Sequence, residues 1–345
     1  MTGSVHILVL RFSALGDVAM TIPVLQQLLE QHPQVRLTVV SQKMVAPLFA
    51  TLPRTRFVGI NPAKEYPGTA GLFRLFRRIQ QEGPFDAIAD LHQVLRTQVL
   101  RQFFQWKGYR TAKLHKGRAA RKALTRQYQK RREPLQPVVE KYAQVFADLG
   151  FPIQLIRRKP VLAKPSLSAT TQRYFAFHKR VIGFAPFAQH EAKRWNPEQS
   201  KLLTHALAEA GWQVLLLGAP GAEAHQLASW LDPALSIQVI AGVHSFEEEL
   251  AIIAHLDTMI SMDSANMHLA ALYGVRVVSL WGATHPYAGF FGWELDPADI
   301  VQDEQLPCRP CSVFGNKACY RGDYACWRSI TVSRVMDAVQ RFPRT

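Results

Sequence analysis

The stretch VHILVLRFSALGD, residues 5–17, contains the pattern that decides the fold. Its apolar part, His6–Leu10, predicts a buried strand, and helical periodicity follows over Val18–Glu30. The loop between them contains Gly16, which permits a tight turn, and it lacks the G-x-G-x-x-G pattern of a dinucleotide-binding turn. A strand, a short loop and a helix in this order predict the first unit of an α/β fold with a parallel sheet.

The same alternation continues through the rest of the first half of the chain. Strands are expected at Val35–Val40, Arg56–Ile60 and Phe85–Leu91, and helices at Lys43–Leu52, Leu72–Gln81 and Val138–Leu149. The last of these helices ends at Gly150, a residue typical of a helix C-terminus. Because Pro152–Ser168 is polar, basic and contains proline, its end is interpreted as a linker, and the domain boundary is expected between residues 165 and 166.

The pattern then restarts. Strands are expected at Val181–Phe187, Trp212–Leu217, Thr258–Met262 and Val275–Leu280, and helices from Pro197 to Gly211, from the capping box at residues 245–248 to His255, and at Met267–Tyr273. The sequence therefore predicts two Rossmann-like, doubly wound parallel-sheet domains, residues 1–165 and 166–345, facing each other. Ligands bind beyond the carboxyl ends of strands in such sheets, so the loops after the first strand of each half and after Met262 should carry the chemistry.

Positive charge is concentrated in one part of the chain. The 345 residues carry a net charge of +15, and Arg96–Arg132 contains thirteen Lys or Arg residues but no Asp or Glu. Such a field implies an anionic partner, namely a nucleic acid, a membrane surface or a phosphorylated substrate, and the alternative is a solvated surface. Aromatic residues interleave with these charges, as in some nucleic-acid binders. The stretch matches no RNA-binding signature, so a nucleic acid is not the expected partner.

The N-terminal apolar run is too short for a membrane span and has no cationic leader. Elsewhere no apolar segment approaches the roughly 20 residues that a transmembrane helix needs. A cytoplasmic location is therefore expected.

The four cysteines, Cys308, Cys311, Cys319 and Cys326, have the spacing C-x2-C-x7-C-x6-C. A disulfide framework is not expected without a secretory signal. Four thiolates in one loop can hold a tetrahedral structural zinc. The usual zinc pattern has two C-x2-C pairs, however, and the alternative is four reduced thiols that pack a loop.

Three loops contain candidate functional residues. Asp17 lies at a helix start, where the helix dipole favours a carboxylate; it can act as a general base on a hydroxyl, or it is only a helix cap. In the loop of residues 186–195, Lys193 can meet a phosphate, or it is an ordinary surface charge.

The third loop is MDSANMH, residues 262–268. Small residues between a strand and a helix leave amides free to hold a diphosphate. Asp263 can orient this loop, and His268 falls one helical turn later, on the side of the same pocket. A lone histidine at such a position is more often a structural residue than a ligand-binding one.

Together these loops resemble glycosyltransferase family nine, the ADP-heptose:lipopolysaccharide heptosyltransferases. The resemblance covers nearly the whole chain, including the cysteine-containing tail. The segments that carry it are SALGD (13–17) followed by TIP (21–23), DLH (90–92) followed by Arg96-Thr97, AKRW (192–195), DSANMHLA (263–270) and WGAT (281–284).

The resemblance implies a fold of the GT-B type, with the nucleotide sugar in the C-terminal domain and the acceptor against the N-terminal one. It implies that Asp17 is the catalytic base and that Lys193 contacts the donor diphosphate. The remaining donor-binding residues would be Glu223, near the adenosine ribose, and Asp263, Ser264, Ala265, Asn266 and His268. The sequence departs from the pattern at Phe187-Ala188, which offers no hydroxyl where some members have Thr or Ser.

The implied reaction is a single in-line displacement with inversion, in which an acceptor hydroxyl attacks the anomeric carbon of ADP-heptose. Lys193 and the helix N-terminus near Asn266 would stabilise the leaving diphosphate, so no cofactor and no catalytic metal are expected. The expected acceptor is the acidic inner core of a lipopolysaccharide precursor, either lipid A-Kdo or a heptosylated core. Its binding residues would be Ser13, Gly16, Arg96, Arg118, Arg121 and Lys122.

The basic segment 96–132 is expected to be a mobile insert of the N-terminal domain that forms the acceptor-side wall. Its charges would hold the enzyme peripherally at the anionic inner leaflet. The alternatives are a transferase of the same fold that uses another nucleotide sugar or a protein acceptor, a basic nucleic-acid-binding protein, and an inactive lipid-surface protein.

Overall fold

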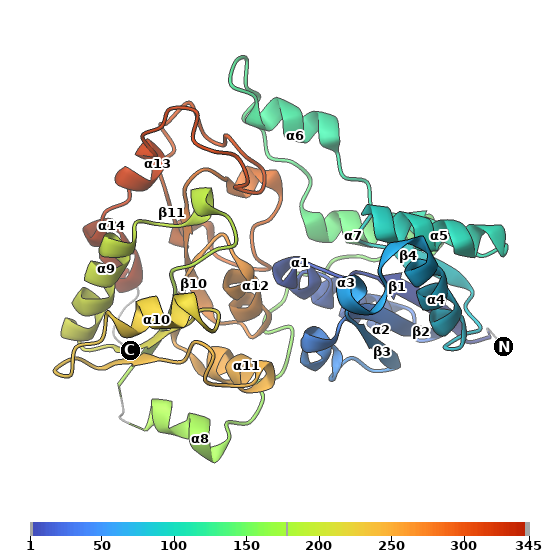
Figure 1. Cartoon of the computed structure of the whole chain (residues 1–345), viewed down its shortest axis with the longest axis horizontal. Coiled ribbons are helices and arrows are strands. Elements are labelled where there is room, and N and C mark those ends of the chain that lie inside the picture. Colours follow the sequence, from blue (N-terminus) through green and yellow to red (C-terminus); the bar gives the residue numbers. More distant parts are fainter. Residues whose placement is uncertain (1–2, 177–178, 342–345) are drawn as a thin grey trace. The chain divides into compact units, whose positions relative to one another are not determined.

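The computed structural model describes residues 3–176 and 179–341. The chain forms two compact units (Figure 1). Unit 1 comprises Met1–Lys116 and Gln136–Arg157, and unit 2 comprises Gly117–Leu135 and Arg158–Thr345. Each unit is built around its own parallel sheet.

The sheet of unit 1 has five parallel strands in the order β3-β2-β1-β4-β5. Their bounds are β1 (Val5–Leu10), β2 (Val35–Gln42), β3 (Thr55–Ile60), β4 (Ala87–Asp90) and β5 (Arg110–Lys113). The chain winds outward from β1 to β3 and then returns to add β4 on the other side of β1. The strand order therefore reverses between β1 and β4, which is where ligands bind in doubly wound sheets.

Helices cover the sheet of unit 1: α1 (Leu15–Ala19), α2 (Ile22–Gln31), η1 (Lys43–Phe49), α3 (Pro62–Glu65), α4 (Gly68–Gln80), α5 (Leu95–Trp106) and α7 (Val138–Asp148). Leu8 and Leu10 of β1 pack in one cluster with apolar residues of α4 and α5. Within that cluster the rings of Phe76 and Phe104 lie 4.8 Å apart, edge to face. Such aromatic pairs stabilise a core beyond the area they bury.

The helix expected over Val18–Glu30 is two helices. The hydroxyl of Thr21 donates to the carbonyl oxygen of Val18 (2.7 Å) and closes α1. Pro23 then lies in the first turn of α2. Because proline has no amide hydrogen, it fits the first turn of a new helix but not the interior of a continuous one.

The sheet of unit 2 has six parallel strands in the order β11-β10-β9-β6-β7-β8. Their bounds are β6 (Val181–Ala185), β7 (Gln213–Leu216), β8 (Ile237–Val239), β9 (Thr258–Met262), β10 (Arg276–Trp281) and β11 (Ile300–Gln302). The order reverses between β6 and β9, so this sheet repeats the plan of the first. The prediction of two doubly wound parallel-sheet domains is confirmed.

The helices of unit 2 are α6 (Arg118–Thr125), α8 (Ala169–Gln172), η2 (Arg173–Phe175), η3 (Glu191–Lys193), α9 (Pro197–Glu209), α10 (Ala222–Ala228), α11 (Phe246–His255), α12 (Ala265–Leu272), η4 (Pro286–Ala288), η5 (Pro297–Asp299), α13 (Ala325–Arg328) and α14 (Val332–Gln340). Asn196 caps α9 through its side chain, and Ser245 and Glu248 form the expected capping box of α11. Buried residues of α9 and α14 pack with the strands in one core.

The basic stretch 96–132 was predicted to be a single insert of the first domain, but the structure divides it between the two units. Residues 95–113 form α5 and the edge strand β5, which belong to the sheet of unit 1. Leu100, Phe104 and Ala112 are buried there. Basic composition masked this apolar periodicity, because the charges lie on the outward positions of regular elements. Only residues 117–135, called here the basic arm, leave unit 1, and by their contacts they belong to unit 2.

The basic arm makes several contacts within unit 2, and its mobility without acceptor stays a prediction. The ammonium group of Lys130 donates to the carbonyl oxygens of Cys308 (2.6 Å) and Pro310 (2.7 Å). The guanidinium group of Arg121 lies 5.3 Å from the ring centre of Phe290 and 5.4 Å from that of Phe314. Among the helices of the described residues, none is long and apolar enough to cross a membrane.

Candidate active-site loops

Three of the predicted functional residues, Asp17, Lys193 and Asp263, lie at the two switch points of strand order. In unit 1, Asp17 follows β1 and His92 follows β4; in unit 2, Lys193 follows β6 and Asp263 follows β9. Each pair of strands is adjacent in its sheet. The topology therefore brings side chains that are 70 or more residues apart in sequence to the same edge of one sheet.

At the first switch point, Asp17 forms an ion pair with Arg11. One guanidinium nitrogen of Arg11 lies 2.5 Å from Oδ2 of Asp17, and the other donates to the carbonyl oxygen of Leu91 (2.7 Å). The side chain of Arg11 is 7% exposed and that of Asp17 is 26% exposed. Arg11 thus joins the loops after β1 and β4 and holds a carboxylate that reaches solvent.

Asp17 is not the cap of α1. The N-cap position is Ala14, no side chain caps the helix, and Asp17 lies within the first turn. The carboxylate there benefits from the positive end of the helix dipole. The structure therefore does not show the hydrogen bonds that the helix-cap interpretation requires. The carboxylate of Asp17 remains partly exposed, as the general-base interpretation requires.

The segment after β4 forms a tight turn that places His92. The buried Asp90 accepts hydrogen bonds from the backbone amides of His92 (3.0 Å) and Gln93 (2.8 Å). Burial raises the pKa of Asp90 above its usual value, and these hydrogen bonds oppose that shift. Burial, with the charges of Arg11 and Lys116, lowers the pKa of His92 to about 3. The imidazole of His92 is therefore uncharged at neutral pH.

The predicted acceptor residues do not all lie in one unit. Ser13 and Gly16 lie in the same loop as Asp17, and Arg96 lies in the first turn of α5, beyond β4. These three are half-buried at the carboxyl edge of the sheet of unit 1. Arg118, Arg121 and Lys122 lie on α6 in the basic arm, which belongs to unit 2.

At the second switch point, the ammonium group of Lys193 lies 2.8 Å from Oδ2 of Asp263. Here the exposures are reversed, because the Lys193 side chain is 16% exposed and that of Asp263 is 6% exposed. Lys193 ends the short helix η3, while Asp263 directly follows β9. The structure thus brings together two residues predicted to bind the donor.

The N-terminus of α12 adjoins this ion pair. Ser264 occupies the N-cap position, but its side chain makes no capping hydrogen bond and instead meets the hydroxyl of Ser261 (3.0 Å). The first-turn amides of Ala265 and Asn266 therefore have no side-chain cap. An uncapped helix N-terminus beside an ammonium group suits an anion such as a diphosphate. His268 lies one turn later and is buried.

Glu223 lies in the first turn of α10, the helix that follows β7. Its Oε2 accepts a hydrogen bond from the amide of Ala219 (2.8 Å), and its Oε1 lies 3.7 Å from the guanidinium of Arg194. Arg194 also donates to the carbonyl oxygen of Ala188 (2.6 Å). The hydroxyl-free segment Phe187-Ala188 is therefore anchored to the residue next to Lys193.

Two buried arginines escaped the sequence interpretation. Arg11 had one signal, a charged residue directly after an apolar strand. Arg309 had none, yet it is fully buried and its guanidinium donates to the carbonyl oxygens of Trp281 and Thr284 (2.9 Å each). It supports the WGAT loop, in which Gly282 leaves room for the ring of Trp327.

The four cysteines are free thiols. Across residues 3–176 and 179–341, no group of three or more His, Cys, Asp or Glu side chains is arranged as it stands to hold a metal ion.

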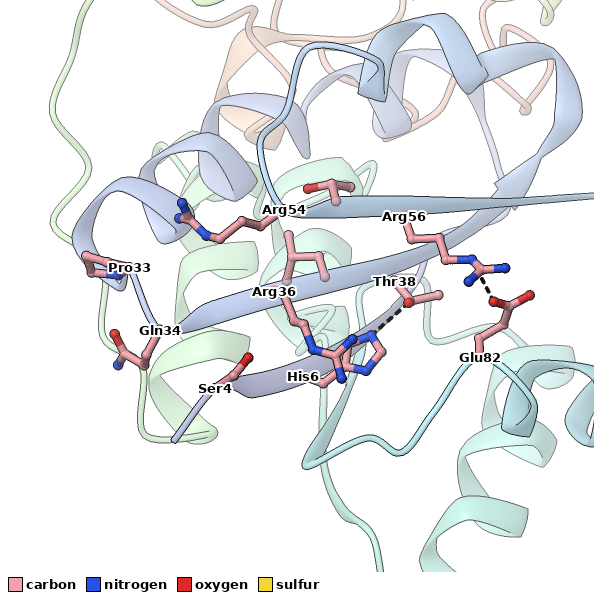
Figure 2. Close-up of a pocket in the computed structure, with 11 residues that line it drawn as sticks. Ser4, His6, Pro33, Gln34, Arg36, Thr38, Arg54, Arg56 and Glu82 are labelled. Carbon is pink, nitrogen blue, oxygen red and sulfur yellow. Dashed lines mark hydrogen bonds and ion pairs between the residues drawn. The ribbon is translucent and has the colours of Figure 1, made fainter. Parts of the chain in front are cut away.

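A pocket of about 620 Å³ lies at the amino-terminal edge of the sheet of unit 1 (Figure 2). Figure 2 shows Arg56 paired with Glu82 (2.7 Å) and His6 bonded to the hydroxyl of Thr38 (2.8 Å). Burial lowers the pKa of His6. His6 lies near the start of β1, whose far end leads to Asp17, so the pocket is not part of the switch-point site.

The comparison with protein families decides the assignment. The model of glycosyltransferase family 9 (heptosyltransferase) matches residues 72–318, which is more than two thirds of the chain. The chain belongs to glycosyltransferase family 9. It is a glycosyltransferase, and the resemblance drawn from the sequence motifs is confirmed.

Known members of the family are similar over most of their length. The chain is 26% identical to lipopolysaccharide heptosyltransferase 3 of Escherichia coli over 285 residues, which cover 78% of this chain and 81% of that protein. Among solved structures, a family 9 glycosyltransferase from Veillonella parvula has a TM-score of 0.75 at 17% identity, covering 99% of this chain and 97% of that one.

The E. coli heptosyltransferase WaaC, solved with ADP, has a TM-score of 0.66 at 17% identity, covering 97% and 99% of the two chains. The predicted GT-B type of fold is confirmed by these likenesses.

Proposed function

We propose that this family 9 enzyme transfers heptose from ADP-heptose to the inner core of a lipopolysaccharide precursor, either lipid A-Kdo or a heptosylated core, with inversion at the anomeric carbon. The observation that carries the proposal is the pair of switch-point ion pairs. One leaves a carboxylate accessible at Asp17, and the other leaves an ammonium group accessible at Lys193, beside an uncapped helix N-terminus.

Asp17 is the proposed general base. In the reaction the acceptor hydroxyl attacks the anomeric carbon, its proton passes to the Asp17 carboxylate, and the bond from that carbon to the diphosphate breaks. Arg11 fixes the position of the carboxylate because it is itself held by the carbonyl oxygen of Leu91. A positioned base of this kind contributes typically about 10²–10⁴-fold to the rate.

Lys193 and the N-terminus of α12 are the proposed diphosphate site. Negative charge grows on the leaving diphosphate in the transition state, and preorganised positive groups stabilise it there. Asp263 holds Lys193 in place before the donor binds. When the donor binds, a phosphate oxygen accepts a hydrogen bond from the ammonium group of Lys193. Ser264, Ala265, Asn266 and His268 would complete the phosphate and sugar contacts, and Glu223 would bind the ribose. The ADP bound to the structurally similar WaaC supports an ADP-linked donor.

This chemistry takes its positive charge from the chain itself, so we expect no cofactor and no metal in the chemical step. The proposed site therefore needs only the nucleotide sugar and the acceptor.

The basic arm and Arg96 are the proposed contacts to the acidic acceptor and to the membrane surface in which it is embedded. Arg118 and Lys122 are exposed on α6. Each basic residue near an anionic bilayer contributes about 1 kcal/mol of attraction. Several such charges would hold a cytoplasmic enzyme reversibly at the inner leaflet.

The direct test is to incubate the purified protein with ADP-heptose and a heptose-deficient lipopolysaccharide core and to measure the acceptor by mass spectrometry. The expected result is an acceptor heavier by one heptose residue, formed about 10²–10⁴-fold more slowly by Asp17→Asn protein. Parallel reactions with other nucleotide sugars and with a protein acceptor test the alternative of a different specificity. A product formed only in those reactions would contradict the proposal.

A further inference from the structure

The cysteine tail of unit 2 surrounds a single small cavity. All four thiol-bearing residues, Cys308, Cys311, Cys319 and Cys326, line this cavity, whose volume is about 10 Å³. They come from one irregular loop and from helix α13, and they are the only cysteines in the sequence. All four are free thiols, so this one cavity brings together every thiol of the sequence.

The backbone that carries these thiols is anchored from several sides. The amide of Cys311 donates to the carbonyl oxygen of Ala283 (3.0 Å), and the carbonyl oxygen of Cys308 accepts from Lys130 (2.6 Å). Next to Cys326, the indole of Trp327 donates to the carbonyl oxygen of Ala192 (2.9 Å). These contacts anchor the backbone at or beside Cys308, Cys311 and Cys326, so the sulfur positions there depend mainly on one side-chain rotation each.

Two cations adjoin the cavity and donate to no carboxylate, because the carboxylate that lines it, Asp323, pairs with Arg321 and Arg328. Arg309 lines the cavity and is fully buried, and its hydrogen bonds go to four backbone carbonyl oxygens and to the amide oxygen of Gln302. The hydrogen bonds of Lys130 also go to uncharged carbonyl oxygens. A buried charge is costly unless an opposite charge compensates it. The surroundings of the thiols thus have two positive charges and favour an anionic group.

We propose that the four cysteines bind one tetrahedral, thiophilic metal ion, zinc or iron, and that this ion fixes the tail. Four thiolates are the donor set that such ions take in closed structural sites. Binding of a divalent ion to four thiols releases four protons and leaves a complex of charge −2. Arg309 and Lys130 balance that charge.

The ion acts on the fold and takes no part in the transfer step. Because no three of the described side chains stand at ligand geometry, the sulfur atoms close on the ion by side-chain rotation, to about 2.3 Å.

The tail lies against the predicted donor loop, so an ion bound in the tail would affect the position of that loop. Gly315 packs on the Lys193 side chain so closely that a Cβ at this position would lie 2.5 Å from Cγ of Lys193. Ala192, the neighbour of Lys193, accepts the hydrogen bond of Trp327. An ion that fixes the tail therefore supports the position of Lys193. This consequence rests on the proposed function, whereas the metal content does not.

The first test is elemental analysis of wild-type protein purified without chelators from cells grown with zinc and iron. The expected content is about one zinc or iron per chain, and a content below about 0.1 per chain would overturn the proposal. Replacement of the ion by Co²⁺ should give the absorption bands of tetrahedral cobalt thiolate. A cobalt spectrum without thiolate bands would also overturn it.

The second test compares Cys308→Ser and Cys319→Ser with the matched control Asp323→Asn. Asp323 lines the same cavity but carries no thiol. The cysteine variants should lose the ion, and the control should keep it. Metal retained by both cysteine variants would contradict thiolate binding.

If the cysteine variants do not fold, titration of native wild-type protein with a mercurial reagent gives the answer. Metal release should be complete at about four equivalents of reagent. Four thiols that react without metal release would overturn the proposal.

The link to Lys193 is tested by ADP binding. Protein stripped of the ion should bind ADP several-fold more weakly than the reconstituted protein, measured by calorimetry. If the stripped protein binds ADP as tightly as the reconstituted protein, and the reconstituted protein holds about one ion per chain, the link to Lys193 is refuted while the metal site itself is supported.

Discussion

The two units place an ion pair at the same topological position, but they expose opposite members of it. In unit 1 the cation Arg11 is buried and the carboxylate Asp17 reaches solvent, with side-chain exposures of 7% and 26%. In unit 2 the carboxylate Asp263 is buried and the cation Lys193 is the more exposed partner, with exposures of 6% and 16%. The same fold therefore presents a partly exposed carboxylate at one sheet and a partly exposed ammonium group at the other.

This difference shows how a repeated fold acquires two chemical roles. In each case the buried partner is fixed by its place at a strand end and holds the exposed partner in position. Arg11 is tied to the loop after β4, and Asp263 directly follows β9. Under the proposed function, the site rather than the fold decides that unit 1 acts on the acceptor and unit 2 on the donor. The following predictions remove or alter one side of this comparison at a time.

The largest effect is expected for Asp17→Asn. The amide keeps the shape of the side chain and can accept a hydrogen bond from Arg11, but it cannot take a proton, so turnover should fall by about 10²–10⁴-fold. Steady-state assay of heptose transfer measures this loss. Asp148→Asn, at an exposed carboxylate of the same unit, is the control and should leave turnover unchanged. A variant that keeps more than about half the wild-type rate would show that Asp17 is not the base.

Lys193→Ala should reduce kcat/KM for ADP-heptose by about 10²–10³-fold, the usual cost of removing one preorganised charge contact in a transition state. Since the change leaves Asp263 buried without a cation, the double variant Lys193→Ala/Asp263→Asn separates loss of stability from loss of catalysis. Lys179→Ala, at an exposed lysine of the same unit, serves as the control. Wild-type kinetics in the single variant would remove Lys193 from the site.

Arg11→Gln tests the buried partner of the first pair. The base remains but loses its fixed position, and misplacement of a catalytic group by about 1 Å can cost about 10²-fold, so kcat should fall by about 10- to 100-fold. The KM for ADP-heptose should change little, and Arg11→Lys should restore part of the rate because it restores the cation. Equal loss in both variants, together with a lower melting temperature, would indicate a purely structural role.

Reversal of exposed charges on the basic arm should affect the acceptor. Changing Arg118, Lys122 and Arg126 to Glu should raise the acceptor KM at least about tenfold and weaken sedimentation with anionic vesicles at low salt, at about 1 kcal/mol per charge. A control with the same charge change uses Lys164, Arg173 and Lys179. The arm and the predicted donor residues share unit 2, so ADP affinity must be measured in parallel. A variant that loses only ADP affinity would contradict an acceptor role.

The smallest effect concerns His92, whose pKa is lowered to about 3 in the folded protein. The unfolded chain takes up a proton near pH 6.5 while the folded protein does not, so this residue reduces stability as the pH falls below about 6.5. His92→Asn should therefore lose less stability than wild type between pH 7 and pH 5, by on the order of 1 kcal/mol. Denaturant melts at both pH values measure this difference. Parallel losses in the two proteins would show that His92 titrates normally.

Much of the fold can be predicted from apolar periodicity, and the errors of that prediction have physical reasons. The strands at the two switch points are continuous apolar runs, which is why β1, β6 and β9 were predictable. The elements α5 and β5 were missed because basic residues on their outer positions hid the periodicity of Leu100 and Phe104. The attachment of the basic arm to unit 2 depends on long-range contacts such as those of Lys130 with the cysteine loop, and no local pattern encodes such contacts.

The positions of the candidate residues were predictable where they come soon after strands, and their roles stay predictions. Asp17, Lys193 and Asp263 stand in short loops after buried strands, so both topology and motif pointed to them. The pairing of Lys193 with Asp263 was not predictable, because it depends on which strands are neighbours. Arg11 and Asp17 both follow β1, and their pairing depends on the conformation of that loop. The residues predicted to bind the acceptor are divided between the units, since Ser13, Gly16 and Arg96 lie in unit 1 while Arg118, Arg121 and Lys122 lie in unit 2.

The most direct test of the central claim is calorimetric titration of ADP into the wild-type, Asp17→Asn and Lys193→Ala proteins. If unit 1 presents the base and unit 2 the diphosphate site, Asp17→Asn should bind ADP within about twofold of wild type and Lys193→Ala at least about tenfold more weakly, which is about 1.4 kcal/mol. Equal losses in the two variants, or weaker binding by Asp17→Asn alone, would contradict the division of roles between the two ion pairs.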